Sequence, residues 1–287
     1  MAGLCEGRVA IVTGAARGVG RQHALQLAKA GAKIVVNDLG AGVDGKGADV
    51  SPAQQVVDEI KAGGGDDVSS FDGAKNMVDT AINTFGKLDI VVNNAGILRD
   101  RMLVNMTEEE WDSVIAVHLK GTFAPARHAA SYWRAMSKQN DIINTSSTSG
   151  IYGNVGQTNY GAAKAGIAAF TIIAARELSR IGVTVNAISP TAYTRMTDNL
   201  REYTEDEVAV RDPSWVSPTV VYLASEEAQD ITGRVIQAGA GRVAVCEGWR
   251  RGAEVDQMDD PAALGPKIRK MIAECRKNSG MDGLELD

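Results

Sequence analysis

A tyrosine and a lysine stand four positions apart in this sequence, at Tyr160 and Lys164. Residues at this spacing share one face of a helix, so the two side chains are expected to lie together. A free tyrosine has a pKa of about 10, and it needs a neighbouring cation to exchange a proton near neutral pH. The pair therefore indicates general acid–base chemistry, although the same spacing also occurs on many solvated helix faces.

Hydroxyl side chains follow an apolar segment that is expected to form a strand over 142–146. Open α/β sheets bind their ligands at the carboxyl ends of strands, so Ser147 could donate a hydrogen bond to a substrate oxygen. The alternative is a set of turn-forming serines.

A glycine-rich turn follows the first predicted strand, and Asp38 ends the second one. Such a turn lets backbone N–H groups approach a pyrophosphate at a helix N-terminus. The Asp38 carboxylate could accept hydrogen bonds from ribose hydroxyls and would repel a 2′-phosphate, which favours NAD over NADP. Arg17 lies in the same turn and could instead pair with a 2′-phosphate.

The elements that would position these residues alternate between strands and helices. This order predicts an α/β fold, with a doubly wound parallel sheet of about seven strands and helices on both faces. A single dinucleotide-binding and catalytic domain is expected over 1–255, followed by a helical extension over 256–287. The predicted strands are 9–13, 33–37, 68–71, 88–93, 142–146, 183–188 and 235–238, and the predicted helices are 21–30, 51–62, 74–85, a long helix from 107 broken near 121–125, and 160–181.

Four motifs together resemble the short-chain dehydrogenase/reductase family. They are the turn TGAARGVG, the tetrapeptide Asn93-Asn94-Ala95-Gly96, Ser147, and the Tyr160–Lys164 pair, in the family's order and spacing. The resemblance implies that Tyr160 is the general acid/base, that Ser147 orients the carbonyl, and that Lys164 holds the nicotinamide ribose and lowers the Tyr160 pKa. The implied cofactor-binding residues are Gly14, Arg17, Gly18, Val19, Gly20, Asp38, Asp72, Asn93, Ala95, Gly96, Tyr160, Lys164, Ile188 and Thr194.

Two positions depart from the family pattern. Thr191 stands after Pro190 where the family usually has glycine, and His118 stands where it usually has asparagine. His118 is therefore a further candidate for catalysis, as a proton relay, and its alternative role is that of a packed helix histidine. The phrases NNAGILRDR and SGIYGNVGQ resemble the family's (3R)-hydroxyacyl-CoA dehydrogenases, a subgroup in which His118 is ordinary. This closer resemblance implies NAD(H)-dependent interconversion of a (3R)-3-hydroxyacyl-CoA and a 3-ketoacyl-CoA. Arg99 and Arg101 could then meet phosphates of the CoA.

Other functions remain open at this stage. A hydroxysteroid dehydrogenase acting on a sterol-like substrate and a 3-ketoacyl-carrier-protein reductase are the enzyme alternatives, and Asp38 counts against the second. A dinucleotide-binding sensor without chemistry is a further alternative, which the intact Ser147, Tyr160 and Lys164 argue against. A Ser-His-Asp hydrolase is disfavoured because no nucleophile-elbow motif is present, and no zinc-ligand cluster stands out, so no metal is expected.

Composition narrows the partners. The net charge of −6 argues against nucleic acid as the main partner. No apolar run is long enough to span a membrane, and three scattered cysteines favour a reducing compartment. A cytoplasmic protein is therefore expected, and the family resemblance implies a homodimer or homotetramer.

Overall fold

The computed structural model describes residues 3–285 except 48, 50, 65–66, 71–72, 137–138 and 199–201. The described part of the chain contains one sheet of eight strands in the order β3-β2-β1-β4-β5-β6-β7-β8, of which the last pairs antiparallel. The strands are β1 (Val9–Thr13), β2 (Lys33–Asn37), β3 (Asp67–Ser70), β4 (Ile90–Asn93), β5 (Asn140–Thr145), β6 (Val183–Thr191), β7 (Val235–Gly239) and β8 (Arg242–Cys246).

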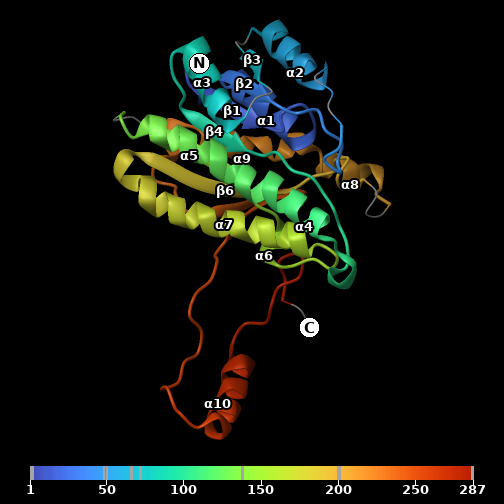
Figure 1. Cartoon of the computed structure of the whole chain (residues 1–287), viewed down its shortest axis with the longest axis vertical. Helices are drawn as coiled ribbons and strands as arrows, with labels where there is room; N and C mark the ends of the chain where they lie inside the picture. Colours follow the sequence, from blue (N-terminus) through green and yellow to red (C-terminus); the bar gives the residue numbers. More distant parts are fainter. Residues whose placement is uncertain are drawn as a thin grey trace.

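Helices cover both faces of this sheet (Figure 1). Successive strand residues point to opposite faces, so Val12 packs into the cluster with α1, α2 and α9, while Ile11 packs into the cluster with α3, α5 and α7. The α-helices are α1 (Gly18–Lys29), α2 (Ser51–Ala62), α3 (Ala74–Phe85), α4 (Glu108–Ile115), α5 (Gly121–Trp133), α6 (Thr148–Ile151), α7 (Thr158–Leu178), α8 (Glu205–Val210), α9 (Ser217–Leu223) and α10 (Pro261–Glu274).

The predicted doubly wound parallel sheet is confirmed, and β8 is the strand that the sequence did not predict. It follows β7 through a two-residue turn, Ala240-Gly241, in which both residues have positive φ. Such turns are usually signalled by Asn-Gly or Asp-Gly, and alanine at a positive φ gives no comparable signal. The short helices α8 and α9 were also not predicted.

The break in the long helix was predicted near Gly121 and Pro125, but the irregularity lies just before them, as a π-helical turn, η2 (Ala116–Lys120), between α4 and α5, and Pro125 lies inside α5. Upstream, the Thr107 side chain and Glu110 form the predicted capping box at the start of α4. A π-helical turn inside a longer helix often marks a functional position, and this one carries His118.

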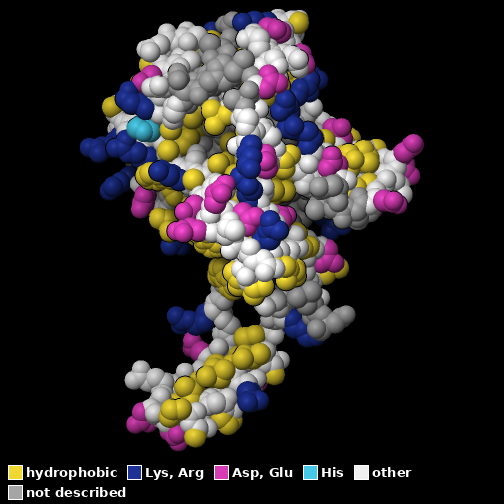
Figure 2. Space-filling model, turned by 45° about the vertical axis from the view of Figure 1, so that its right-hand side comes forward, with side chains coloured by type: hydrophobic (Ala, Val, Ile, Leu, Met, Phe, Trp, Pro, Cys, Tyr) yellow, Lys and Arg dark blue, Asp and Glu magenta, His cyan; other side chains and the backbone are white. Residues whose placement is uncertain are grey.

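The chain beyond β8 leaves the body and forms an arm that ends in α10 before it returns (Figure 1). No residue of α10 is buried, and apolar side chains gather along one side of the arm (Figure 2). This helix lies within the segment expected to be a helical extension. Among the described residues, no helix is both long enough and apolar enough to cross a bilayer.

Candidate active site

The glycine-rich turn between β1 and α1 is shaped by close backbone approaches. Gly14 and Gly18 have φ values of +64° and +55°, which side chains disfavour. A Cβ on Gly20 would lie 2.1 Å from the Gly14 carbonyl oxygen, and one on Gly14 would lie 2.7 Å from the Ala95 Cα. These glycines therefore let the turn pack directly against the loop that follows β4.

Two side chains hold that packing, and the sequence analysis gave neither a role. Asn94 Nδ2 donates to the backbone oxygens of Thr13 and Gly14 at 3.0 and 3.2 Å. Thr13 Oγ1 accepts from the backbone N–H groups of Asn94 and Ala95 at 3.0 and 3.1 Å. The signal that could have identified these contacts is a polar residue at the end of one strand, Thr13, and an asparagine directly after the neighbouring strand of the sheet, Asn94.

Asp38 lies at the end of β2, as expected for a residue that recognises ribose. Its Oδ2 accepts from Ala16 N–H at 2.9 Å, and its Oδ1 accepts from Gly40 N–H at 2.7 Å. The carboxylate thus also fastens the glycine-rich turn. Arg17 lies 3.8 Å from the exposed Asp49 carboxylate, a weak surface ion pair that leaves the arginine adaptable.

These residues fit a dinucleotide. Among the described residues, no side chain caps the N-terminus of α1, and the first turn of α1 holds no acidic residue. Its free backbone N–H groups suit a pyrophosphate. Thr194 lies beside Gly18, since a Cβ there would be 3.6 Å from Thr194 Cγ2.

The other predicted cofactor residues line the neighbouring strand ends. Asn93 ends β4 and donates from Nδ2 to Asn144 Oδ1 at 2.9 Å, while its buried Oδ1 has no partner among the described residues. Ile188 lies in β6, where its carbonyl accepts from Ser146 N–H. Asp72, predicted to contact adenine, lies outside the described residues.

Ser147 lies at the carboxyl end of β5 and caps α6. Its Oγ accepts from Ser149 N–H at 3.2 Å, and its hydroxyl is near enough to Tyr160 to lower the pKa of that phenol. Gly150 allows this contact between α6 and α7, because a Cβ there would lie 2.6 Å from Lys164 Cβ. The structure therefore brings the three predicted catalytic residues together.

Lys164 is almost completely buried, with 2% of its surface exposed. Its Nζ donates to the Thr145 carbonyl at 2.7 Å and lies 5.5 Å from the centre of the Tyr160 ring. Burial disfavours the charged ammonium and lowers the pKa of Lys164 to about 7.

The Tyr160 hydroxyl is held as a proton donor. Burial raises the pKa of Tyr160 to about 12, the Ser147 hydrogen bond lowers it, and the charge of Asp100 raises it further. Burial therefore outweighs the stabilisation that was expected from Lys164. At neutral pH the phenol carries its proton, which suits ketone reduction.

His118 packs behind this centre. Its Nε2 lies 2.8 Å from the Ile97 carbonyl oxygen, and its ring meets the Tyr160 ring edge-on at 5.1 Å. Gly96 makes room for it, since a Cβ there would lie 2.4 Å from His118 Cε1. Burial and the charge of Lys164 lower the pKa of His118 to about 3, so the imidazole is neutral at neutral pH.

Asn159 is a further site residue that the sequence analysis missed. Its buried side chain donates to the carbonyl oxygens of Arg99 and Glu110 at 3.0 and 2.9 Å, and its Oδ1 accepts from Tyr160 N–H at 2.7 Å. It therefore ties the start of α7 to the loop after β4 and to α4. Within the described residues, no group of three acidic, histidine or cysteine side chains could hold a metal ion.

The family model described as "short chain dehydrogenase" matches residues 8–207, and the chain belongs to this family. The chain is accordingly an oxidoreductase that acts on a CH–OH group. This result confirms the family resemblance found in the sequence, and with it the expectation of a nicotinamide dinucleotide cofactor.

Named relatives narrow the comparison. The chain is 46% identical over 250 residues to "Hydroxyacyl-CoA dehydrogenase ChsB1" of Mycobacterium tuberculosis, covering 80% of this chain and 76% of that enzyme. It is 46% identical over 268 residues to "Peroxisomal multifunctional enzyme type 2" of Drosophila melanogaster, where the match covers 90% of this chain but only 44% of the longer enzyme. A crystal structure of a short chain dehydrogenase from Mycobacterium avium is 47% identical, with a TM-score of 0.87, covering 99% of this chain and 100% of that one.

Proposed function

We propose that the protein is an NAD(H)-dependent dehydrogenase that interconverts a (3R)-3-hydroxyacyl-CoA and the 3-ketoacyl-CoA. The observation that carries the reaction is the meeting of Ser147, Tyr160 and Lys164 at the carboxyl ends of the strands, beside the glycine-rich turn. The names of the relatives, which include a hydroxyacyl-CoA dehydrogenase, support the substrate class.

The residues of this chain would divide the work as follows. Ser147 donates a hydrogen bond to the carbonyl oxygen of the substrate, and Tyr160 gives that oxygen its proton during reduction and takes it back during oxidation. Lys164 ties α7 to the end of β5 through its bond to the Thr145 carbonyl and provides a cation next to Tyr160. The nicotinamide, when bound, supplies or accepts the hydride.

The choice of NAD rests on Asp38. Its carboxylate lies at the end of β2 and is fixed by two backbone N–H groups, so it cannot easily swing away from a 2′-phosphate. Fixed negative charge at this point would repel NADP while leaving ribose hydroxyls acceptable.

The surroundings of the site suit an acyl chain. The loop after β4 and the loop between α6 and α7 lie together, and both carry exposed apolar side chains, with Met102 at 54% and Val155 at 82% exposure. Arg101 already pairs through two nitrogens with Glu110 at 3.2 and 2.9 Å. Arg99 makes a longer ion pair, at 3.7 Å to the exposed Glu109, and its Nε has no partner among the described residues, so Arg99 is the stronger candidate for a CoA phosphate.

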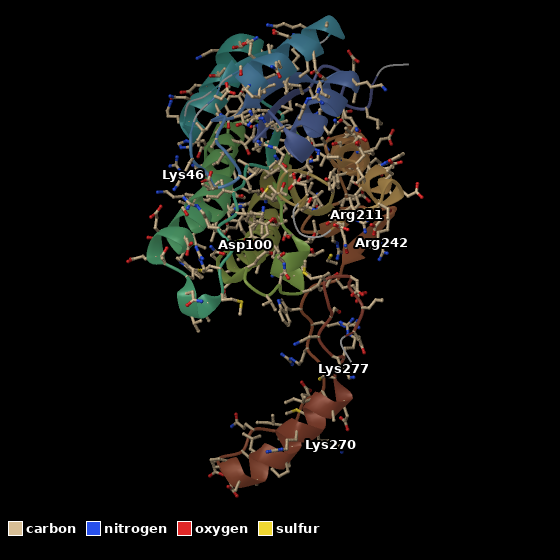
Figure 3. All side chains as sticks on the ribbon, turned by 90° about the vertical axis from the view of Figure 1, so that its right-hand side faces the viewer. Lys46, Asp100, Arg211, Arg242, Lys270 and Lys277 are labelled. Carbon is tan, nitrogen blue, oxygen red and sulfur yellow. The ribbon has the colours of Figure 1, made fainter. Side chains whose placement is uncertain are left out.

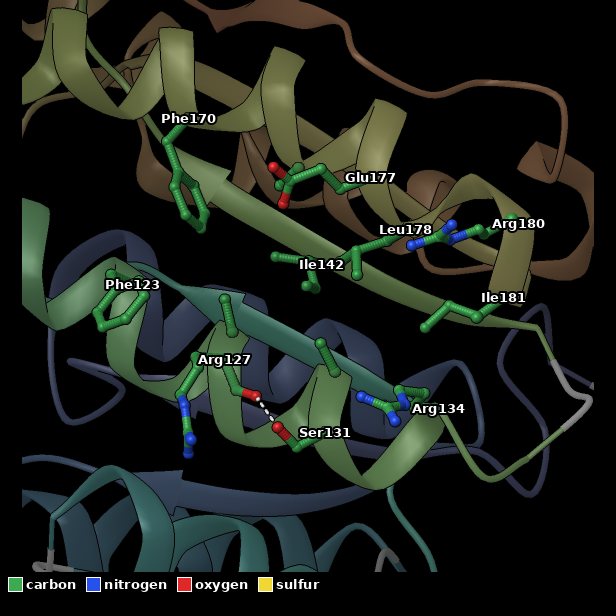
Figure 4. A pocket seen from close by; sticks show the side chains of 13 residues that line it. Phe123, Arg127, Ser131, Arg134, Ile142, Phe170, Glu177, Leu178, Arg180 and Ile181 are labelled. Carbon is green, nitrogen blue, oxygen red and sulfur yellow. Dashed lines mark hydrogen bonds between the residues drawn. The ribbon is translucent and has the colours of Figure 1, made fainter.

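A homodimer or homotetramer in the cytoplasm completes the proposal. A mainly apolar hollow between α5 and α7 includes Phe123 and Phe170 (Figure 4). Phe170 follows Tyr160 along α7 by about three helical turns. This surface, away from the chemistry, suits contact with another copy. The cysteines are free, and Cys275 is exposed, which suits a reducing compartment.

The test is reduction of NAD⁺ with the separate 3R and 3S hydroxyacyl-CoA thioesters and with a 17β-hydroxysteroid. Selective turnover of the 3R thioester is expected. Preference for the 3S thioester, or turnover of the steroid alone, would reject the proposed substrate while leaving the dehydrogenase assignment in place. Repeating the assay with NADP⁺ and with a carrier-protein thioester tests the alternative of a carrier-protein reductase.

A further inference from the structure

Two loops meet beside the catalytic residues. The Arg101 N–H donates to the Gly156 carbonyl at 2.8 Å, and Arg101 forms a parallel β-bridge with Gln157. This pairing places the Asp100 side chain, labelled in Figure 3, against the segment that leads into α7. The dehydrogenase mechanism derived above gives Asp100 no part.

The buried Gln157 side chain links Asp100 to Ser149. Gln157 Nε2 donates to Asp100 Oδ2 at 2.7 Å. Its Oε1 accepts from Ser149 Oγ at 2.7 Å and from Asn154 Nδ2 at 3.0 Å. Because the amide donates at one end and accepts at the other, its orientation is fixed, and the three side chains form a continuous hydrogen-bond chain.

This chain ends at Ser147. Ser149 N–H donates to Ser147 Oγ at 3.2 Å, so a lone pair of the Ser147 oxygen is occupied by a backbone donor. The Ser147 proton then remains available to Tyr160 or to a substrate oxygen. Holding Ser149 from its other side through Gln157 keeps that arrangement in place.

Asp100 also acts on Tyr160 through its charge. The negative charge of Asp100 raises the Tyr160 pKa. Burial raises the pKa of Asp100 itself, and the bond from Gln157 opposes this shift. The other titratable groups that the described residues place around Tyr160 are Lys164 on α7 and His118 on the π-helical turn.

We propose that Asp100 and Gln157 are positioning residues of the reaction: Gln157 fixes Ser147 through Ser149, and Asp100 holds Gln157 and places a negative charge beside the start of α7, the helix that carries Tyr160. This proposal rests on the proposed roles of Ser147 and Tyr160, and it is independent of which alcohol is the substrate. It predicts opposite effects on turnover for substitutions at the two residues. Loss of the Gln157 amide should slow the reaction because Ser147 is then less well placed, whereas loss of the Asp100 charge should speed it.

Asp100→Asn separates the charge from the hydrogen bond, since the new amide oxygen can still accept from Gln157 Nε2. Removing the charge should lower the pH midpoint of alcohol oxidation by about 0.5–1 unit. Below that midpoint, the rates of oxidation and of reduction should both rise by about 2–3-fold. A change in the pKa of a general acid or base alters the reaction rate by about half as much on a logarithmic scale. Both rates rise together because a substitution cannot change the equilibrium constant of the reaction. Loss of a purely structural contact would lower the rate instead.

Gln157→Leu breaks the chain and keeps the charge, so kcat should fall by about 10-fold while NADH binding stays unchanged. If this variant does not fold, Ser149→Ala removes the same link with less disruption, and a fall in kcat of several-fold is expected.

The matched control for Asp100→Asn is Asp58→Asn on α2, where Gln54 Nε2 donates to Asp58 Oδ1 at 2.9 Å on an exposed helix surface. This control should leave turnover and the pH midpoint unchanged.

The outcomes separate the inference from the function beneath it. Unchanged or lower turnover in Asp100→Asn, with the pH midpoint unmoved and NADH binding intact, overturns the role of the charge. Normal kcat in both Gln157→Leu and Ser149→Ala overturns the role of the chain. If Tyr160→Phe instead keeps its turnover, the proposed proton donor has failed, and the inference fails with it.

Discussion

The cofactor half and the catalytic half of this site are held in place by different means. Around the glycine-rich turn, backbone packs on backbone, and Thr13, Asn94 and Asp38 fasten that packing through main-chain N–H and carbonyl groups. Around Tyr160, side chains bond to side chains, as in the chain from the exposed Asp100 through the buried Gln157 to the buried Ser149. The first half should therefore be sensitive to added volume, and the second to changed polarity or charge.

The largest expected effect tests the catalytic half. Tyr160→Phe keeps the ring that packs against His118 and removes the proton that the reaction requires. Turnover should fall by about 10²–10⁴-fold, as is usual for loss of a general acid, while NADH still binds. Stopped-flow reduction and NADH fluorescence titration measure the two properties separately.

Tyr222→Phe is the matched control, because Tyr222 is exposed on α9. Its turnover should equal that of the unmodified protein. If Tyr160→Phe retained more than about a tenth of the activity, the proton would have to come from another group.

Added volume tests the cofactor half. In Gly20→Ala the new methyl group would lie 2.1 Å from the Gly14 carbonyl oxygen and 2.3 Å from Asn94 Nδ2, so the turn must shift. NADH affinity should fall by about 10²-fold, because a displacement of the turn misaligns several N–H donors together. Isothermal titration calorimetry gives the affinity.

Gly265→Ala makes the same change in the exposed helix α10, far from the cofactor half, where a Cβ would meet no atom of the described residues within 4 Å. This control should bind NADH normally. Equal affinity in Gly20→Ala would show that the turn adapts and that backbone packing does not define the cofactor half.

Asp38 offers a way to change selectivity within that half. Asp38→Ala removes the charge that repels a 2′-phosphate, so the preference for NADH over NADPH should narrow by about 10-fold. The variant also loses the bonds to Ala16 and Gly40, and NADH affinity should fall as well. Asp38→Asn keeps one acceptor, so it should narrow the preference with a smaller loss of NADH affinity. An unchanged ratio in both variants would remove Asp38 as the selector.

The two halves also differed in how far the sequence predicted them. The glycine-rich turn, Ser147, Tyr160 and Lys164 were all found from residue types and short spacings, since a turn and a helix face are local features. The chain from Asp100 to Gln157 was not found. It depends on two loops that are separated by more than fifty residues and meet only after β4 and β5 pair in the folded sheet.

The predicted fold was confirmed, and the edge strand β8 was missed for a different reason. The six parallel strands other than β3 could be recognised because each contains a buried apolar segment, which a parallel sheet requires. Strand β8 also has an apolar sequence, over 243–246, but it follows β7 after only two residues and so departs from the strand–helix alternation on which the prediction rested. The irregularity that carries His118 was expected a few residues later, near Gly121 and Pro125, because glycine and proline are the residues that disrupt helices, whereas the π-helical turn precedes both.

His118 allows a test through pH. Its pKa of about 3 in the folded protein lies below the ordinary value of 6.5, so the unfolded chain binds a proton that the folded protein does not. Stability from this group is complete above pH 6.5 and is lost as the pH falls towards 3. His118→Asn should flatten the plot of unfolding free energy against pH in that window by up to about 1.4 kcal/mol per pH unit.

Urea unfolding at several pH values measures this slope. A residual slope is expected from His23, whose pKa burial also lowers to about 3, and His23→Asn should flatten the curve similarly. Proton relay through His118 stays a prediction. A new limb in the pH–rate profile of His118→Asn would support it, and a profile of unchanged shape would count against it.

The smallest effect is expected outside both halves, in the arm. Deletion of 256–287 removes α10, which buries no residue, together with an exposed ion pair between Arg276 and Glu247 at 3.6 Å. Exposed pairs contribute about 1 kcal/mol or less, so the melting temperature should change by less than about 4 °C, and Tyr160-dependent turnover should persist. Such a result supports residues 1–255 as a domain that folds without the extension.

The apolar side chains on the arm are exposed, with Ile272 at 68% and Trp249 at 100% exposure, so a large loss of stability would have a specific meaning. A fall of 10 °C or more, with a change in oligomeric state by light scattering, would show that the arm buries these side chains against another chain, and the division at residue 255 would then be wrong.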